Sequence, residues 1–205
     1  NRSSNDTGFE VNDYTVKLGY APLDSKSSIE LKLQYVDQDS NQSYLGLTDN
    51  DFLQDSYQRY GISAIDNIKT EHKQVVLRYN YDYSDTLGFT AVAYNNEHAR
   101  NWFKTEGIDL NGSADADSLS RTSWSNIIND INTNSSRDGV SSSDLSRILS
   151  GELDTAVGSI DMRSNNREYF SRGIQLGFNW SGSIGDVTHS LEGSIRVHQD
   201  EEDRM

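Results

Sequence analysis

The sequence predicts an all-β fold, an antiparallel meander of about six strands, and two observations support this prediction. Apolar and polar residues alternate over several segments, and short turns join these segments in pairs that long polar connections separate. Alternation with a period of two places apolar side chains on one face of a strand and polar side chains on the other. The predicted strands lie near residues 9–20, 28–38, 72–83, 87–102, 167–181 and 187–203.

The first three segments alternate most strictly, and each has one face of aliphatic and aromatic side chains. These residues are Tyr14, Val16, Leu18 and Tyr20, then Ile29, Leu31, Leu33 and Tyr35, then Val75, Leu77, Tyr79, Tyr81 and Tyr83. The opposite face carries polar and charged residues, such as Lys17, Lys32 and Arg78. A face of this charge is unsuited to a protein core, so only the apolar face is predicted to need an apolar partner.

The last three segments continue the pattern, with one ambiguity. In the fourth, Leu87, Phe89, Ala91 and Ala93 compete with Val92 and Tyr94 for the apolar face. In the fifth, only Arg172 interrupts an apolar face of Phe170, Ile174, Leu176, Phe178 and Trp180. In the sixth, Leu191, Ile195 and Val197 oppose polar residues. We expect Arg172 to extend toward a membrane interface.

The connections alternate between short and long. Short turns lie at residues 21–26, 84–86 and 182–186, and the long connections span 39–71 and 103–166. Short turns at one end and long outer loops at the other are typical of outer-membrane β-barrels, whereas compact soluble domains seldom contain structureless loops of this length. Tyr20, Tyr83 and Trp180 each precede a short turn, as in an aromatic girdle at a membrane interface. A β-sandwich also explains the alternation, but not the difference in loop length.

The second long loop contains two stretches with helical spacing. Trp124, Ile127, Ile128 and Ile131 form one, and Ser143, Leu145, Ile148 and Leu149 form the other, with a serine cap. Two interpretations remain open: surface helices that fold the loop, or a mobile loop with weak local helicity.

Composition narrows the function. The chain has 32 acidic and 18 basic residues, a net charge of -14, and no cysteine. This charge disfavours a nucleic-acid partner, and the absence of cysteine excludes disulfides and thiolate ligands. No phosphate-binding glycine loop or paired catalytic constellation is present, so we expect no enzyme and no cofactor. The first residue is Asn1 and the alternation continues to the end, so we expect the chain to be part of a longer protein.

Three motifs resemble those of a known family. The first is Ser43-Tyr44-Leu45-Gly46-Leu47-Thr48-Asp49-Asn50-Asp51-Phe52, followed by Tyr57-Gln58-Arg59-Tyr60, Asp66 and His72. The others are Ala93-Tyr94-Asn95-Asn96 with Arg100-Asn101-Trp102-Phe103-Lys104, and Asn165-Asn166-Arg167-Glu168-Tyr169-Phe170-Ser171-Arg172-Gly173-Ile174-Gln175. Together they resemble TonB-dependent outer-membrane receptors, in particular the ferric dicitrate transporter branch.

The resemblance implies a 22-stranded transmembrane barrel in the bacterial outer membrane, closed by a plug domain, which imports a ferric chelate with energy delivered by TonB. The chain would supply about six strands and two outer loops, without the plug. Its partners would be the chelate, the plug, TonB and outer-membrane lipid. The alternative is a passive porin-like channel, or a surface β-sandwich or adhesin, with no transport role.

An anionic ferric chelate requires cationic side chains, and guanidinium groups bind carboxylates through two hydrogen bonds. The candidates are Arg59, Arg78 and Arg100, with Tyr57 and Tyr60 beside Arg59. We predict that Arg59 acts through ligand binding, and the rival hypothesis pairs it with Asp51 or Asp55 to order the loop. The four histidines are scattered, so no metal site is predicted.

The two faces of the strands have different expected environments. We expect lipid to contact the face with Ile29, Leu31, Leu33, Leu77, Tyr79, Leu176 and Phe178. The face with Lys32, Arg78, Asn80, Gln175 and Glu192 should line the barrel interior.

Overall fold

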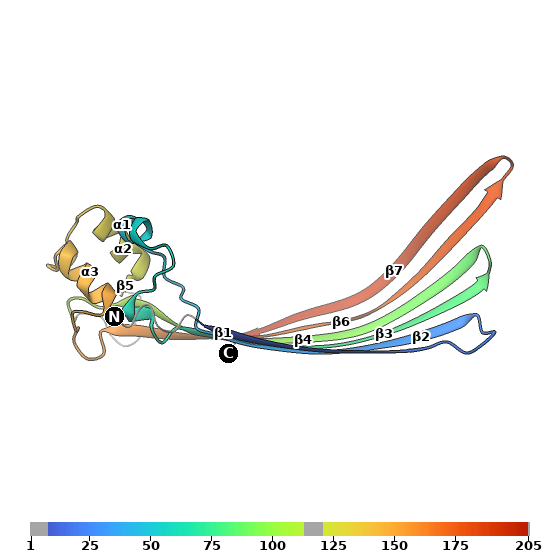
Figure 1. The fold of residues 1–205 in the computed structure, drawn as a ribbon, viewed down its shortest axis with the longest axis horizontal. Helices are drawn as coiled ribbons and strands as arrows, with labels where there is room; N and C mark the ends of the chain where they lie inside the picture. Colours follow the sequence, from blue (N-terminus) through green and yellow to red (C-terminus); the bar gives the residue numbers. More distant parts are fainter. Residues whose placement is uncertain (1–7, 113–120, 205) are drawn as a thin grey trace. The chain divides into compact units, whose positions relative to one another are not determined.

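The computed structural model describes residues 8–112 and 121–204. Their strands form one seven-stranded antiparallel sheet, and the two long connections contain short helices. Six strands lie side by side in chain order, β1-β2-β3-β4-β6-β7, and the short β5 pairs with β4 (Figure 1). The strands are β1 Phe9–Tyr20, β2 Ser27–Ser40, β3 Asn67–Ser84, β4 Leu87–Ile108, β5 Thr122–Ser123, β6 Ile160–Ile184 and β7 Val187–Arg204.

The predicted meander is confirmed, and β2 pairs with β3 across the long connection between them. Every predicted strand range lies within an observed strand, but several strands are longer. β4 continues to Ile108 and β6 begins at Ile160, so the connections shorten to residues 41–66 and 109–159. Only a few apolar residues, such as Phe103, Ile108 and Ile160, lie in these extensions, so alternation indicates them weakly. Strand pairing needs only the backbone groups.

Two hairpins are tighter than the sequence suggested. Asp85 and Thr86 alone separate β3 from β4, and the Ser84 hydroxyl accepts a hydrogen bond from the Leu87 amide at 3.1 Å. Gly185 and Asp186 join β6 to β7, and Gly185 has a positive φ of 64°. Two-residue turns with positive φ match the twist of the flanking strands.

The described residues divide into two compact units. The loop unit comprises Gln38–Lys69 and Asn101–Asn165 with the first residues of β1. The sheet unit comprises Val11–Asp37, Thr70–Arg100 and the C-terminal strands from Asn166 onward. Five strands, β1, β2, β3, β4 and β6, contribute residues to both units.

The sheet unit has one apolar and one polar face. Most of its predicted apolar residues are exposed, among them Ile29 at 39%, Leu176 at 53% and Val197 at 75%. On the other face, the Thr90 hydroxyl bonds to Asn80 at 3.1 Å. This contact places the even-numbered residues of β4 on the polar face, and it settles the ambiguity in favour of Leu87, Phe89, Ala91 and Ala93 as the apolar set.

The loop unit contains the apolar core of the described residues. Its helices are α1 Asp49–Gln54, the 3-10 helix η1 Gly61–Ser63, α2 Trp124–Asn132 and α3 Ser142–Ser150. The serine cap predicted for the second helical stretch is present, since the Ser141 side chain accepts a hydrogen bond from the Asp144 amide. Ser123 caps α2 in the same way and accepts a hydrogen bond from the Asn126 amide. The core residues are Tyr60, Ile108, Trp124, Ile127, Leu145, Ile148 and Leu149. The second long loop therefore contains folded, packed helices.

Within the described part of the chain, no helix has the length and apolar character needed to cross a membrane.

Candidate binding pocket in the loop unit

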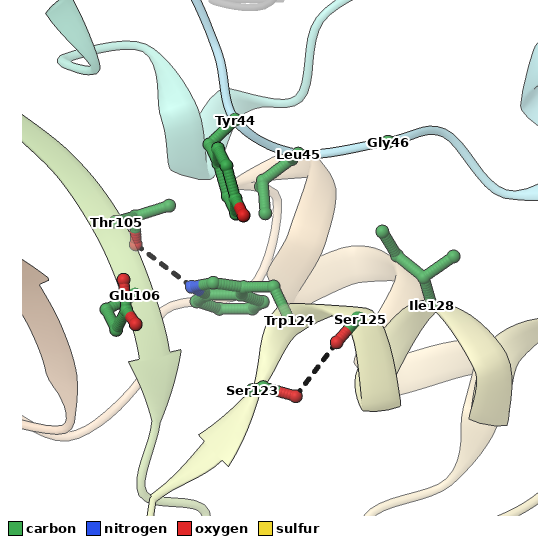
Figure 2. A pocket seen from close by; sticks show the side chains of 9 residues that line it. All are labelled: Tyr44, Leu45, Gly46, Thr105, Glu106, Ser123, Trp124, Ser125 and Ile128. Atoms are coloured by element: carbon green, nitrogen blue, oxygen red, sulfur yellow. Dashed lines mark hydrogen bonds between the residues drawn. The ribbon is translucent and has the colours of Figure 1, made fainter. Parts of the chain in front are cut away.

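The loop unit contains a pocket of about 440 Å³ between three segments of the chain. The β2–α1 connection, β4 and the start of α2 supply its walls (Figure 2). The lining residues are Tyr44, Leu45, Gly46, Thr105, Glu106, Ser123, Trp124, Ser125 and Ile128. An apolar cavity with a few polar groups is the usual form of a small-molecule site.

Trp124 is the fixed wall of the pocket. It is the first residue of α2, directly after the Ser123 cap, and only 2% of it is exposed. Its indole Nε1 donates a hydrogen bond to the Thr105 hydroxyl at 3.0 Å (Figure 2). Burial of the ring and this bond together dock α2 against β4.

Tyr44 is the more exposed wall and is held by a cation. The Lys104 ammonium lies 3.6 Å from the Tyr44 ring centroid, within cation–π range. The Tyr44 ring also meets Trp102 edge to face, with centroids 5.1 Å apart. Trp102 and Lys104 are two residues apart in β4 and therefore lie on the same face of the strand, and together they orient the Tyr44 ring.

Glu106 lines the pocket, and its carboxylate forms ion pairs with two cationic side chains. Lys104 Nζ lies 2.9 Å from one oxygen and Arg163 Nη1 lies 3.1 Å from the other. These pairs offset the negative charge. The pocket therefore suits a planar ring with hydroxyl groups, which can stack on the Tyr44 ring and bond to the hydroxyls of Ser123 and Ser125.

Behind the pocket, Asp66 fastens the end of the β2–β3 connection to β4. Its carboxylate is fully buried, and Oδ1 accepts a hydrogen bond from the Thr105 amide at 2.8 Å. Burial raises the pKa of Asp66, although the hydrogen bond from Thr105 and the charge of Arg59 oppose this shift.

Arg59 is placed inside the loop rather than on an open surface. It is 5% exposed, and its guanidinium donates to the main-chain carbonyls of Asn41, Ser63 and Asp66. In this structure the side chain orders the connection between β2 and β3. Ordering of the loop is the role that the rival hypothesis gave to Arg59. That hypothesis named Asp51 or Asp55 as the partner, whereas the structure shows main-chain carbonyls. Contact between Arg59 and a ligand stays an untested prediction.

The two tyrosines beside Arg59 have opposite environments. Tyr60 is 5% exposed, donates to Asp51 Oδ2 at 2.7 Å, and accepts a bond from the Thr48 amide at 2.8 Å. Burial raises the pKa of Tyr60 to about 12. Tyr57 is 92% exposed. Of this pair, only Tyr57 presents its ring to an incoming molecule.

The other predicted arginines lie in the sheet unit. Arg78 is exposed, and its side chain has no hydrogen bond or ion pair within the ranges that the structure describes. Arg100 is half-buried, and its Nε lacks a hydrogen-bond partner among those same residues. Arg172, on the apolar face, donates to Gln199 at 3.1 Å instead of extending alone.

The sequence prediction did not include Tyr44, Thr105, Glu106 and Trp124 as site residues. Tyr44 lies in the first motif, and Trp124 was expected only as an apolar helix residue. Two sequence motifs could have indicated this pocket, because one contains Tyr44 and another contains Trp102 and Lys104. Tyr44 contacts both of these residues, which lie about sixty positions away, and hydrophobic periodicity cannot predict contacts over such a separation.

Comparison with known proteins finds solved structures that share the fold of this chain. No protein-family model and no curated protein matches the sequence. Two crystal structures of the ferric-catecholate import receptor Fiu from E. coli K12 match the fold. The open form has a TM-score of 0.60 over 98% of this chain, and the closed form has 0.58 over 98%, each at 11% identity.

The chain spans 29% of the open-form receptor chain and 27% of the closed-form chain. This similarity shows that the chain has the fold of the matched part of Fiu, an antiparallel strand meander. It does not distinguish the ferric dicitrate branch, which stays a prediction.

Proposed function

We propose that this chain forms part of the wall of a 22-stranded outer-membrane barrel that imports a ferric chelate with energy from TonB. One observation carries the proposal: the sheet unit exposes one apolar face, and on the opposite face hydrogen bonds link polar side chains of neighbouring strands. Lys32 donates to Gln74, and Gln74 donates to Asn96, at 2.7 and 2.8 Å. Lipid is the apolar partner that such a face needs, and a closed barrel satisfies every backbone group within it.

The dimensions of the apolar band support the proposal. From Val75 to Tyr83, β3 advances about 27 Å at roughly 3.4 Å per residue. A strand tilt of about 40° reduces this length to roughly 20 Å along the membrane normal, close to the band of about 25 Å in outer-membrane barrels. Tyr83 and Trp180 end the band beside the short turns, where amphipathic rings favour the interface.

Arg78 and Arg100 are the best candidates for binding an anionic chelate. Both occupy the polar face, and each has a guanidinium nitrogen that no described residue satisfies. The pocket between Tyr44 and Trp124 suits an aryl ring of a chelate, which is compatible with the ferric-catecholate ligand class of Fiu. We retain ferric citrate as the second ligand class because its carboxylates match guanidinium geometry.

Uptake by the full-length receptor tests the proposal. Cells that express it, with or without TonB, are supplied with radioactive iron as ferric citrate or as a ferric catecholate. We expect saturable uptake of at least one chelate, and only in cells with TonB. Uptake that is unsaturable and independent of TonB would establish the porin-like alternative, and absence of uptake with either chelate would contradict import of these ligands.

Binding to the purified receptor tests the arginines. We expect Arg78→Gln and Arg100→Gln each to weaken chelate binding by about ten- to a hundredfold, since a hydrogen bond to a charged group contributes about 1.5–3 kcal/mol. Arg172→Gln is the matched control because it removes the same charge from the apolar face. Equal affinity in all three variants would remove Arg78 and Arg100 from the site.

A further inference from the structure

Two histidines face each other across β3 and β4. The ring centroids of His72 and His98 lie 6.0 Å apart, with the rings inclined by 53°. The hydrogen bond from Gln74 to Asn96 joins the same two strands at 2.8 Å. His72 lies two residues before Gln74 in β3, and His98 lies two residues after Asn96 in β4. Because these strands are antiparallel, the histidine pair occupies the next position on the polar face.

The His98 ring also meets the Tyr169 ring, with centroids 5.9 Å apart, but this contact occupies no ring nitrogen through a hydrogen bond. Neither His72 nor His98 forms a side-chain hydrogen bond within residues 8–112 and 121–204. His198 differs, because its two ring nitrogens contact the Tyr94 hydroxyl at 2.7 Å and an Asp200 oxygen at 2.6 Å. The pair therefore keeps ring nitrogens available as electron-pair donors.

The spacing of the rings fits a shared metal ion. An imidazole nitrogen binds zinc at about 2.0–2.1 Å, which places the ring centroid about 3.2 Å from the ion. Two imidazoles on one ion then have centroids about 5.2 Å apart at a tetrahedral angle and about 6.4 Å apart when they lie on opposite sides of the ion. The observed 6.0 Å lies in this range. We propose that His72 and His98 form a two-ligand site for a divalent transition metal such as Cu²⁺, Ni²⁺ or Zn²⁺.

The surroundings define the kind of site. Among the described residues, no group of three or more His, Cys, Asp or Glu side chains is placed to hold a metal. The protein thus supplies two ligands, and water completes the coordination. Arg100, two residues beyond His98 on the same face, adds a positive charge that weakens cation binding. Copper should bind most tightly, because imidazole suits it and it stands highest in the affinity order of divalent ions.

This site is separate from the proposed chelate transport. Neutral imidazole nitrogens suit borderline divalent ions, whereas a ferric ion in a chelate is held by the oxygen atoms of its own ligand. A copper or nickel ion between β3 and β4 would join two adjacent strands through their side chains.

Copper titration of the full-length protein in detergent micelles tests the proposal, with electron paramagnetic resonance as the readout. The wild type should show a spectrum with two coordinated imidazole nitrogens. His72→Gln and His98→Gln should each weaken this copper binding by about tenfold or more, equivalent to about 1.4 kcal/mol, and reduce the coupling to one nitrogen. His189→Gln, an exposed histidine of β7, is the matched control and should leave the site unchanged.

A second measurement needs no variant. Diethyl pyrocarbonate modifies free imidazoles, so peptide mass spectrometry with and without Zn²⁺ should show protection of His72 and His98 but not of His189. The proposal is overturned if these two histidines are modified equally with and without the metal. It is also overturned if both variants keep the wild-type copper spectrum.

Discussion

The loop unit and the sheet unit treat their apolar residues in opposite ways. In the loop unit, Trp124 and Leu149 are buried at 2% and 0% exposure, and helical spacing turns them toward a shared core. In the sheet unit, Leu176 and Phe178 remain 53% and 40% exposed, although apolar and polar residues alternate regularly along this strand. A hydrophobic pattern thus specifies which residues share a face, while the surroundings of that face specify what covers it.

The largest effect should come from the core of the loop unit. We expect Trp124→Ala to destabilise the loop unit by about 3–5 kcal/mol, because it removes a buried aromatic ring and leaves a cavity. Limited proteolysis of the full-length protein measures this as faster cleavage between α1 and α3. The control is Tyr57→Ala, which removes an exposed ring of the same unit. Similar cleavage of both variants would mean that the core does not hold the loops.

The next effect should separate the two faces of the sheet unit. We expect Leu176→Arg to destabilise the barrel by about 2–4 kcal/mol, as for a cation near the bilayer midplane. Gln175→Arg places the same charge on the polar face and should change little. Folded fractions come from urea titration in lipid vesicles, read by heat-modifiable gel mobility. Equal stability of the two variants would contradict lipid contact at the apolar face.

A smaller effect should come from the buried cation of the loop unit. Arg59→Met keeps much of the side-chain volume but leaves the carbonyls of Ser63 and Asp66 without this donor. We expect a loss of about 1.5–3 kcal/mol, typical of hydrogen bonds to a charged group, seen as faster proteolysis of residues 41–66. Weaker chelate binding with unchanged proteolysis would instead support the ligand-binding role predicted from the sequence.

The smallest effect should come from Tyr60, whose contribution to the stability of the loop unit depends on pH in alkaline solution. The pKa of Tyr60 is near 12 in the folded loop unit and 10.0 in an unfolded chain. A raised pKa means that its stabilisation is complete below pH 10 and is lost as the pH rises toward 12. Tyr60→Phe should abolish this pH dependence and cost roughly 1–2 kcal/mol at neutral pH, because the hydrogen bonds of its hydroxyl to Asp51 and Thr48 are both lost. Proteolysis rates at several pH values measure both; an unchanged alkaline profile would assign the dependence to other groups.

Sequence patterns predicted the strands and their order, and they indicated the two main helices as one of two open interpretations, because period and capping are local properties. The prediction was weakest where chemistry depends on contacts between distant segments. The sequence offered Arg59 and Arg78 equally as candidate ligand-binding cations, yet Arg59 is buried among main-chain carbonyls and Arg78 is exposed. The pocket wall at Tyr44 depends on Lys104, and no local pattern connects these positions. α1 was missed because its six residues contain no buried side chain and hence no apolar stripe.

The position of Arg59 also bears on how the β2–β3 connection tolerates change. One guanidinium joins Asn41, where β2 has just ended, to Ser63 and Asp66, where β3 is about to begin. The connection is therefore a closed loop with its ends clamped by a side chain, and the residues around Ser56 are an exposed tip. Closure entropy grows only with the logarithm of loop length, by about 0.6 kcal/mol for each doubling. An inserted epitope at this tip would lengthen the loop without loosening its base.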